Sequence, residues 1–191
     1  MAVERNVMWS PWDEAGLEHV RLVQSDQGVL ADGMVIRVKD DHPFRVRYQI
    51  HCDPAWNVRQ VEISLWDSSS ADIRLHADGQ GHWKLDTGGP LQLLDGCMDV
   101  DISITPFTNT LPIRRLGLKQ GQASEILVAY IAVPELDVKP ARQRYACLQA
   151  SPEGGLYRYK GLSTGFTANL PVDGDGLVLD YPKLCRRVWS G

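Results

Sequence analysis

The feature of this sequence that most constrains its fold is an alternation of apolar and polar residues with a period of two. It runs through residues 44–52, 61–65, 71–77 and 98–104. Successive side chains of a β-strand point to opposite faces, so each segment can place apolar groups on one face and charges on the other. The pattern predicts strands of a sheet with one buried face and one polar face.

Further strands and the turns between them extend this pattern along the chain. Short apolar segments are separated by Gly- and Asp-rich turns, which is typical of a meandering antiparallel sheet. The further strand segments are 18–23, 34–38, 126–133, 143–149, 156–160, 166–170 and 176–180. The predicted turns are Asp32-Gly33, Asp53-Pro54, Asp78-Gly79, Gly88-Gly89-Pro90, Asp95-Gly96, Gly154-Gly155 and Asp173-Gly174.

Segment 105–118 breaks the alternation and predicts the principal helix. Thr and Asn suit helix N-termini, proline is tolerated in a first helical turn, and Gly117 is a natural stop. Apolar residues lie on most sides of this segment, so we expect it inside the curve of the sheet. We expect Val100, Ile102 and Ile104 to face the helix.

Length and charge limit the domain organisation and exclude several classes of protein. The 191 residues suit a single domain spanning 1–191, since no segment has the composition of a linker. The 20 Lys and Arg residues against 24 Asp and Glu residues give a net charge of −4, which argues against nucleic acid as a partner. The longest apolar run, 126–133, is far shorter than the ~20 residues of a transmembrane helix.

The N-terminus and the cysteines indicate a reducing compartment. Residues 1–5 lack the basic start and apolar stretch of a secretory signal, so we expect a cytoplasmic protein. Cys52, Cys97, Cys147 and Cys185 lie far apart and are predicted to be small buried hydrophobes. The sequence contains no CxxC pair, HExxH motif, phosphate loop or nucleophile elbow, so we expect neither a metal nor a cofactor.

The sharpest cluster of candidate functional residues surrounds two carboxylates. Asp99 and Asp101 share one face of a predicted strand, and Asn109, Arg114 and Arg115 follow in the predicted helix. The two carboxylates can reach one cation or share one proton, as in the acid–base pair of an enzyme. With Arg114 and Arg115 they can instead form a structural clamp between strand and helix. The sequence leaves both interpretations open and favours the clamp.

A second candidate cluster is basic and aromatic. Guanidinium groups suit phosphate or carboxylate, and aromatic faces suit sugar rings or acyl chains, so an amphiphile head group fits here. The alternative is cross-strand packing of tyrosines against long arginine stems. The members of this cluster are Arg142, Arg144, Tyr145, Tyr157, Arg158 and Tyr159.

Several motifs together resemble a known family. The longest is DGCMDVDISITPFTNTLPIRRL at 95–116. The others are Trp9, DPAWNVR at 53–59, GQGHW at 79–83, QRY at 143–145, YRY at 157–159 and GLVLDYP at 176–182. Over about residues 9–188 the chain resembles the bacterial family named putative glycolipid-binding proteins, formerly a domain of unknown function.

The resemblance implies a mainly β (β-rich α+β) fold, a spiral β-roll in which a many-stranded antiparallel sheet wraps around one central helix. It also implies a homodimer and a lipid-like or glycolipid-like ligand. We therefore expect non-enzymatic binding of an amphiphile in the concave apolar interior of the sheet. The expected ligand-binding residues are Asp99, Asp101, Asn109, Arg114, Arg115, Arg144, Tyr145, Tyr157 and Tyr159.

Two other classes of function stay open at the level of sequence. The first is an enzyme of the hydrolase or isomerase type that uses Asp99 and Asp101 with Asn109, Arg114 and Arg115. The second is a dimeric structural module without a small ligand. A cavity larger than packing voids would favour binding, whereas converging carboxylates with raised pKa values in an open cleft would favour the enzyme.

Overall fold

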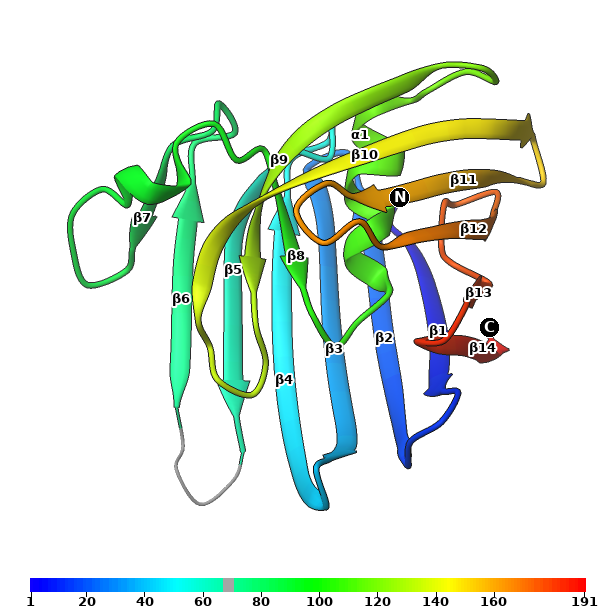
Figure 1. The fold of residues 1–191 in the computed structure, drawn as a ribbon. Helices are drawn as coiled ribbons and strands as arrows, with labels where there is room; N and C mark the ends of the chain where they lie inside the picture. The colour runs from blue at the N-terminus through cyan, green and yellow to red at the C-terminus, as the bar shows by residue number, and fades with distance from the viewer. Residues whose placement is uncertain (67–70) are drawn as a thin grey trace.

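The computed structural model describes residues 1–66 and 71–191, and these residues form two β-sheets with a helical segment between them (Figure 1). The strands of the larger sheet, in the described part of the chain, follow the order β13-β14-β1-β2-β3-β4-β5-β6-β7. Their bounds are β1 Val3–Pro11, β2 Gly16–Ser25, β3 Gly28–Lys39, β4 His42–Cys52, β5 Val58–Leu65, β6 Asp72–Ala77, β7 Trp83–Leu85, β13 Asp180–Tyr181 and β14 Cys185–Ser190.

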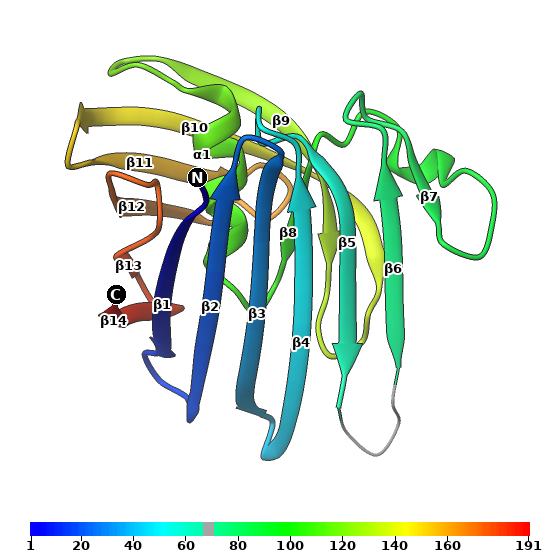
Figure 2. The ribbon, with the colours of Figure 1, turned by 180° about the vertical axis from the view of Figure 1, so that it is seen from behind.

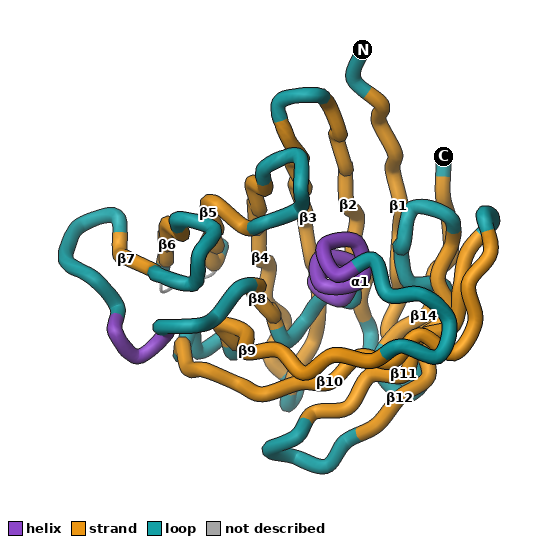
Figure 3. Tube along the Cα trace, turned by 90° about the horizontal axis from the view of Figure 1, so that it is seen from above, coloured by secondary structure: helices purple, strands orange, loops and turns teal. Residues whose placement is uncertain are grey.

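The second sheet curls over one face of the larger sheet and has the order β12-β11-β10-β9-β8 (Figure 3). Its strands are β8 Asp99–Ile102, β9 Ala123–Ile131, β10 Val138–Ser151, β11 Gly154–Gly161 and β12 Thr167–Asp173. The opposite face of the larger sheet lies in the foreground of Figure 2, with no described element in front of β1–β6. This architecture confirms the predicted β-rich fold wrapped around a helix.

The helical segment lies between the sheets and links β8 to β9. It consists of a 3₁₀ turn, η2 (Phe107–Asn109), followed by the helix α1 (Thr110–Leu116). Gly117 ends the helix with a left-handed φ of 54°, as the sequence predicts. Phe107 and Leu111 have no exposed surface, so this segment fills the concave interior of the molecule. A short 3₁₀ turn, η1 (Gln92–Leu94), precedes β8.

The helical crossover has a consequence for strand direction. Because the chain returns through α1 before it enters β9, β8 pairs with β9 in parallel. All other strand pairs in the described ranges are antiparallel. The meandering antiparallel sheet that the sequence predicts therefore holds except at this one pair.

The orientation of β8 differs from the prediction. Asp99 and Asp101 hydrogen-bond to side chains of the helical segment, so the carboxylate face of the strand, and not the Val100 and Ile102 face, is turned toward the helix. Val100 and Ile102 are nevertheless buried, and β8 packs near β5 of the larger sheet. The strand is covered on both faces, and its polar face lies where hydrogen-bond partners are available.

Two predicted turns are wrong. Gly154-Gly155 begins β11, and the turn before it is formed by residues 152 and 153. The other is Asp32-Gly33, and Gly33 explains why. Asp32-Gly33 lies in the middle of β3, and the turn that precedes this strand is formed by residues 26 and 27. A β-carbon on Gly33 would lie 2.1 Å from Cζ of Tyr48, so the glycine is needed for the close approach of the Tyr48 ring. That ring is fully buried on β4.

Other differences from the prediction are local. Residues 176–180 form no full strand: Val178 makes a single bridge to Val172, and β13 begins at Asp180. Strands β1, β7 and β14 lie outside the predicted segments. All four cysteines are buried and free, as expected of small core residues.

Candidate functional site

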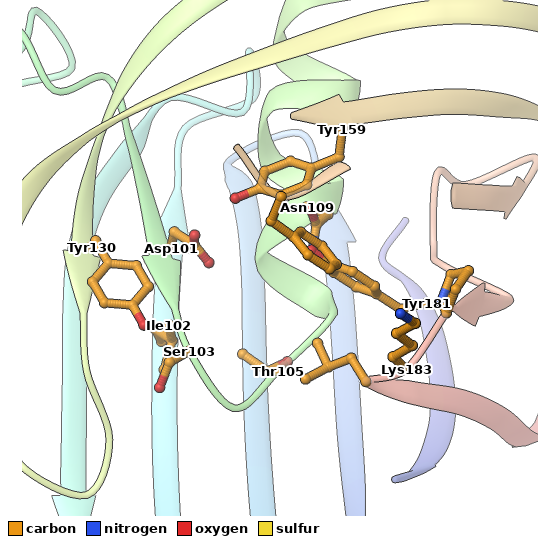
Figure 4. A pocket seen from close by; sticks show the side chains of 12 residues that line it. Asp101, Ile102, Ser103, Thr105, Asn109, Tyr130, Tyr159, Tyr181 and Lys183 are labelled. Atoms are coloured by element: carbon orange, nitrogen blue, oxygen red, sulfur yellow. The ribbon is translucent and has the colours of Figure 1, made fainter. Parts of the chain in front are cut away.

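A cavity opens between the two sheets beside the start of the helical segment (Figure 4). Its volume is about 230 Å³. It adjoins a second cavity of about 530 Å³ that runs along β10, and the two share Asp101, Tyr130, Tyr159 and Phe166. Ligand pockets typically measure about 300–1,000 Å³, so the combined space is large enough for a small molecule.

One wall of the cavity is aromatic. The ring centroids of Tyr159 and Tyr145 are 5.5 Å apart, and the rings meet edge to face. Phe166 and Tyr181 each lie 6.2 Å from Tyr159 and 6.2 Å from each other. Tyr159 and Tyr145 are cross-strand partners on β11 and β10, whereas Tyr181 comes from β13 of the other sheet. Aromatic faces of this kind can stack on sugar rings or acyl chains.

The floor of the cavity is polar, and its side chains are held in place. Oδ2 of Asp101 accepts a hydrogen bond from Nε2 of Gln143 at 2.6 Å, and Oδ1 accepts one from Oγ1 of Thr108 at 3.2 Å. Oδ1 of Asn109 accepts a hydrogen bond from the Tyr145 hydroxyl at 2.9 Å. Burial raises the pKa of Asp101, and the two hydrogen bonds oppose this effect.

Asp99 does not share this cavity. Its carboxylate accepts two hydrogen bonds from Arg115, at 2.9 Å from Nε and 2.5 Å from Nη2. The Asp99 side chain has no exposed surface and that of Arg115 is 14% exposed. Burial raises the pKa of Asp99, and the Arg115 guanidinium opposes the rise. The predicted clamp therefore exists, but between Asp99 and Arg115 alone.

Arg114 lies elsewhere. Its guanidinium carbon is 5.1 Å from the ring centroid of Trp56, a cation–π contact. It lines a separate glycine-rich hollow near Gly117 and Gly176. The expected contact of Arg114 with Asp99 or Asp101 is not formed, because successive helical residues point about 100° apart and Arg115 takes the carboxylate.

The basic and aromatic cluster is divided by the sheet. Arg144 and Arg158 are exposed on the outer face. Arg142 is exposed as well, pairs with Glu125 at 3.0 Å and lines the larger cavity. Tyr145 and Tyr157 alternate with these arginines and are buried on the inner face. Of the nine expected ligand-binding residues, Asp101, Asn109 and Tyr159 line the cavity, and Tyr145 supports it from behind.

Several cavity residues were not predicted from the sequence. Tyr130 lies within the apolar segment 126–133. Tyr181 lies in the GLVLDYP motif and Lys183 directly follows it, and neither belongs to a polar pattern. Thr105 is the first residue of the predicted helical segment, and its Oγ1 accepts a hydrogen bond from the backbone N–H of Phe107 at 3.0 Å. These residues meet only through contacts between the two sheets, which no local pattern encodes.

A buried carboxyl group lies directly beneath Thr105. Oε1 of Glu18 accepts hydrogen bonds from the Tyr48 hydroxyl at 2.6 Å and from Thr105 Oγ1 at 2.5 Å. Glu18 is only 4% exposed, and no ion pair with a described cation compensates its charge. Burial therefore raises the pKa of Glu18 from 4.5 to about 7.

The clamp should be detectable as non-additive loss of stability. We expect Asp99→Asn or Arg115→Gln to lower the free energy of unfolding by about 3–5 kcal/mol, because each leaves its partner buried without compensation. The double substitution should cost less than the sum of the single ones. Chemical denaturation of the three variants at one pH measures this.

The exposed pair Arg142–Glu125 provides the matched control for the clamp. Its side chains are 68% and 53% exposed, so the same cycle there should change stability by about 0–1 kcal/mol. Additive losses at Asp99 and Arg115 would show that the two residues do not act as a pair.

Glu18 should make the stability of the fold depend on pH. The folded protein keeps a proton up to about pH 7 that the unfolded chain loses near pH 4.5. The contribution is therefore complete below pH 4.5 and is lost by about pH 7, a change of about 3 kcal/mol. In Glu18→Gln this decrease should be absent from the pH profile of the unfolding free energy. An unchanged profile would contradict the assignment.

The comparisons with known proteins agree with this fold. A crystal structure of a DUF1089 family protein from Pseudomonas aeruginosa matches with 37% sequence identity and a TM-score of 0.81, over 94% of this chain and 92% of that one. A β-barrel-like protein of the DUF1849 family from Brucella abortus matches with 11% identity and a TM-score of 0.56, over 98% and 97% of the two chains. The second likeness concerns the fold alone.

Within the described residues, no helix has the length and apolar character needed to cross a membrane.

Two further comparisons concern the sequence. None of the curated proteins matches the chain. The sequence model of the family described as "Putative glycolipid-binding" matches residues 6–187, almost the whole chain. The chain therefore belongs to the putative glycolipid-binding family.

Proposed function

We propose that this protein binds an amphiphilic molecule, lipid-like or glycolipid-like, with its polar head group in the cavity between the sheets. The observation that carries the proposal is the composition of this cavity. An aromatic wall of Tyr159, Phe166 and Tyr181 faces a floor that contains Asp101 and Asn109. Aromatic faces with nearby carboxylate and amide groups match the apolar faces and the hydroxyls of a sugar or polyol.

The position of the helix refines where each part of the ligand would lie. The expected concave interior is occupied by Phe107, Leu111 and Ile113, all of which are buried. An acyl chain therefore has its space in the larger adjoining cavity, which Pro140 and Ala141 line on β10. We place the head group over Asp101, where the two cavities meet, and the acyl chain in the part of the larger cavity that Pro140 and Ala141 line.

Binding explains the site better than the enzyme alternative does. An acid–base pair needs two carboxyl groups that reach one substrate. Asp99 is buried in an ion pair with Arg115 and does not line the cavity. Asp101 is left with Gln143 and Thr108, which fix it as a hydrogen-bonding group. The separation of the two carboxylates supports a binding protein without hydrolase or isomerase activity.

Removal of an exposed aromatic wall residue tests the proposal. Phe166 is 41% exposed and lines both cavities, so Phe166→Ala should weaken binding of dodecyl maltoside about tenfold while the fold persists. Isothermal titration below the critical micelle concentration measures the dissociation constant. The control is Leu93→Ala, at a 64% exposed apolar residue outside both cavities. Equal affinities in both variants would refute the proposal, as would a wild type that binds neither dodecyl maltoside nor an anionic amphiphile such as dodecyl phosphate.

We also propose that the protein is cytoplasmic, and that it forms the homodimer that the family resemblance implies. The uncovered outer face of the larger sheet carries the exposed apolar residues Leu17 and Ile36, which are 40% and 53% exposed and are candidates for a contact between copies. Light scattering should give twice the chain mass of 21.3 kDa, and Ile36→Lys should lower it. A monomeric mass for the wild type would exclude the dimer.

A further inference from the structure

We propose that the head group of the ligand carries a negative charge, such as a phosphate, sulfate or carboxylate; this inference rests on the proposed function. Lys183 and Lys139 line the two adjoining cavities, one each. Lys183 comes from the turn between β13 and β14, and Lys139 comes from β10, so the lysines belong to different sheets. The two cavities meet at Asp101, Tyr130, Tyr159 and Phe166.

Both lysines are free to meet a ligand. Neither forms an ion pair within residues 1–66 and 71–191. Nζ of Lys139 lies 5.7 Å from the ring centroid of Tyr130, a contact that holds the ammonium group near the cavity without neutralising it. Lys183 has a left-handed φ of 68°, and Leu184 closes the turn by donating its N–H to the Tyr181 carbonyl.

The acidic groups near the cavities do not balance this charge. Asp101 is the one carboxyl group in the linings of the two cavities, as far as the described residues show. Both of its oxygens already accept hydrogen bonds, and burial raises its pKa, which disfavours the charged form. Arg142, which also lines the larger cavity, is paired with Glu125. Among the described residues that line the two cavities, no charged carboxylate therefore balances the two lysines.

The hydroxyl groups of the walls favour the same kind of ligand. Burial raises the pKa of Tyr130 and of Tyr159, so both phenols keep their protons and can donate hydrogen bonds. Ser163 and Thr164 add hydroxyls at the rim of the larger cavity. A phosphate, sulfate or carboxylate offers several acceptor oxygens to such donors. The chain as a whole has a net charge of −4, so attraction of an anion would be a local property of this site.

The test compares two amphiphiles with the same chain and different heads. Dodecyl maltoside is neutral and dodecyl phosphate is anionic, and each is titrated into the protein below its critical micelle concentration. We expect dodecyl phosphate to bind at least about fivefold more tightly at low salt, and this advantage to shrink in 1 M NaCl because screening weakens exposed charge pairs. Inorganic phosphate alone should bind far more weakly than dodecyl phosphate.

Variants then assign the effect to the two lysines. Lys183→Gln and Lys139→Gln should each weaken binding of dodecyl phosphate about threefold to fivefold and leave the affinity for dodecyl maltoside unchanged. The matched control is Lys160→Gln, at an exposed lysine on β11 that lines neither cavity. It should not change either affinity.

The possible results separate this inference from the proposed function. Equal affinities for both amphiphiles, or an equal loss in Lys160→Gln, would overturn the charge preference while binding itself stands. Inorganic phosphate that binds as tightly as dodecyl phosphate would also overturn it, since the ligand would then be a small anion. Absence of binding of both amphiphiles would refute the proposed function itself.

Discussion

The arrangement of the site depends on the buried ion pair between Asp99 and Arg115. The two residues lie at the start of β8 and in the last turn of α1, 16 positions apart in sequence. Asp101, Thr105, Thr108 and Asn109, which form or support the cavity floor, all lie on the chain between them. The pair closes this segment into a loop. Separating the two ends of the loop would leave a buried charge without its partner, which is strongly unfavourable. The pair therefore fixes the position of the floor.

A second set of contacts fastens the same loop to the larger sheet in a different way. Thr105 donates to Glu18 on β2, and Tyr48 on β4 donates to the same oxygen. Within the described residues Glu18 forms no ion pair, so burial favours its neutral form, whereas the Asp99 charge is matched by Arg115. Both anchors are formed by the chain's own side chains, which hold the floor in place. In the proposed binding, this would avoid much of the entropy cost of ordering side chains.

The sequence predicts the fold better than it predicts the site, for a physical reason. Alternation is a local property, so β4, β5 and β6 could be located from their residues. The helical segment could be located in the same way, from the break in the alternation after residue 104 and from its stop at Gly117. Local rules fail where a distant contact decides. Gly33 suggests a turn until the Tyr48 ring, 15 residues away in the sequence, is seen to lie against it.

Contacts between distant residues also explain which candidate residues line the cavity. Alternation correctly places Asp99 and Asp101 on one face of a strand, but it cannot tell whether solvent or another element covers that face. The parallel pairing of β8 with β9 decides this, because it turns the carboxylates toward the helix and toward Gln143 on β10. Arg115 in the helix pairs with Asp99 and not with Asp101, so the two carboxylates have different surroundings. Asp99 becomes part of the framework through Arg115, and Asp101, which has neutral hydrogen-bond partners, stays at the edge of the open space. The partner that the tertiary structure supplies thus decides whether a carboxylate is buried in an ion pair or lines the cavity.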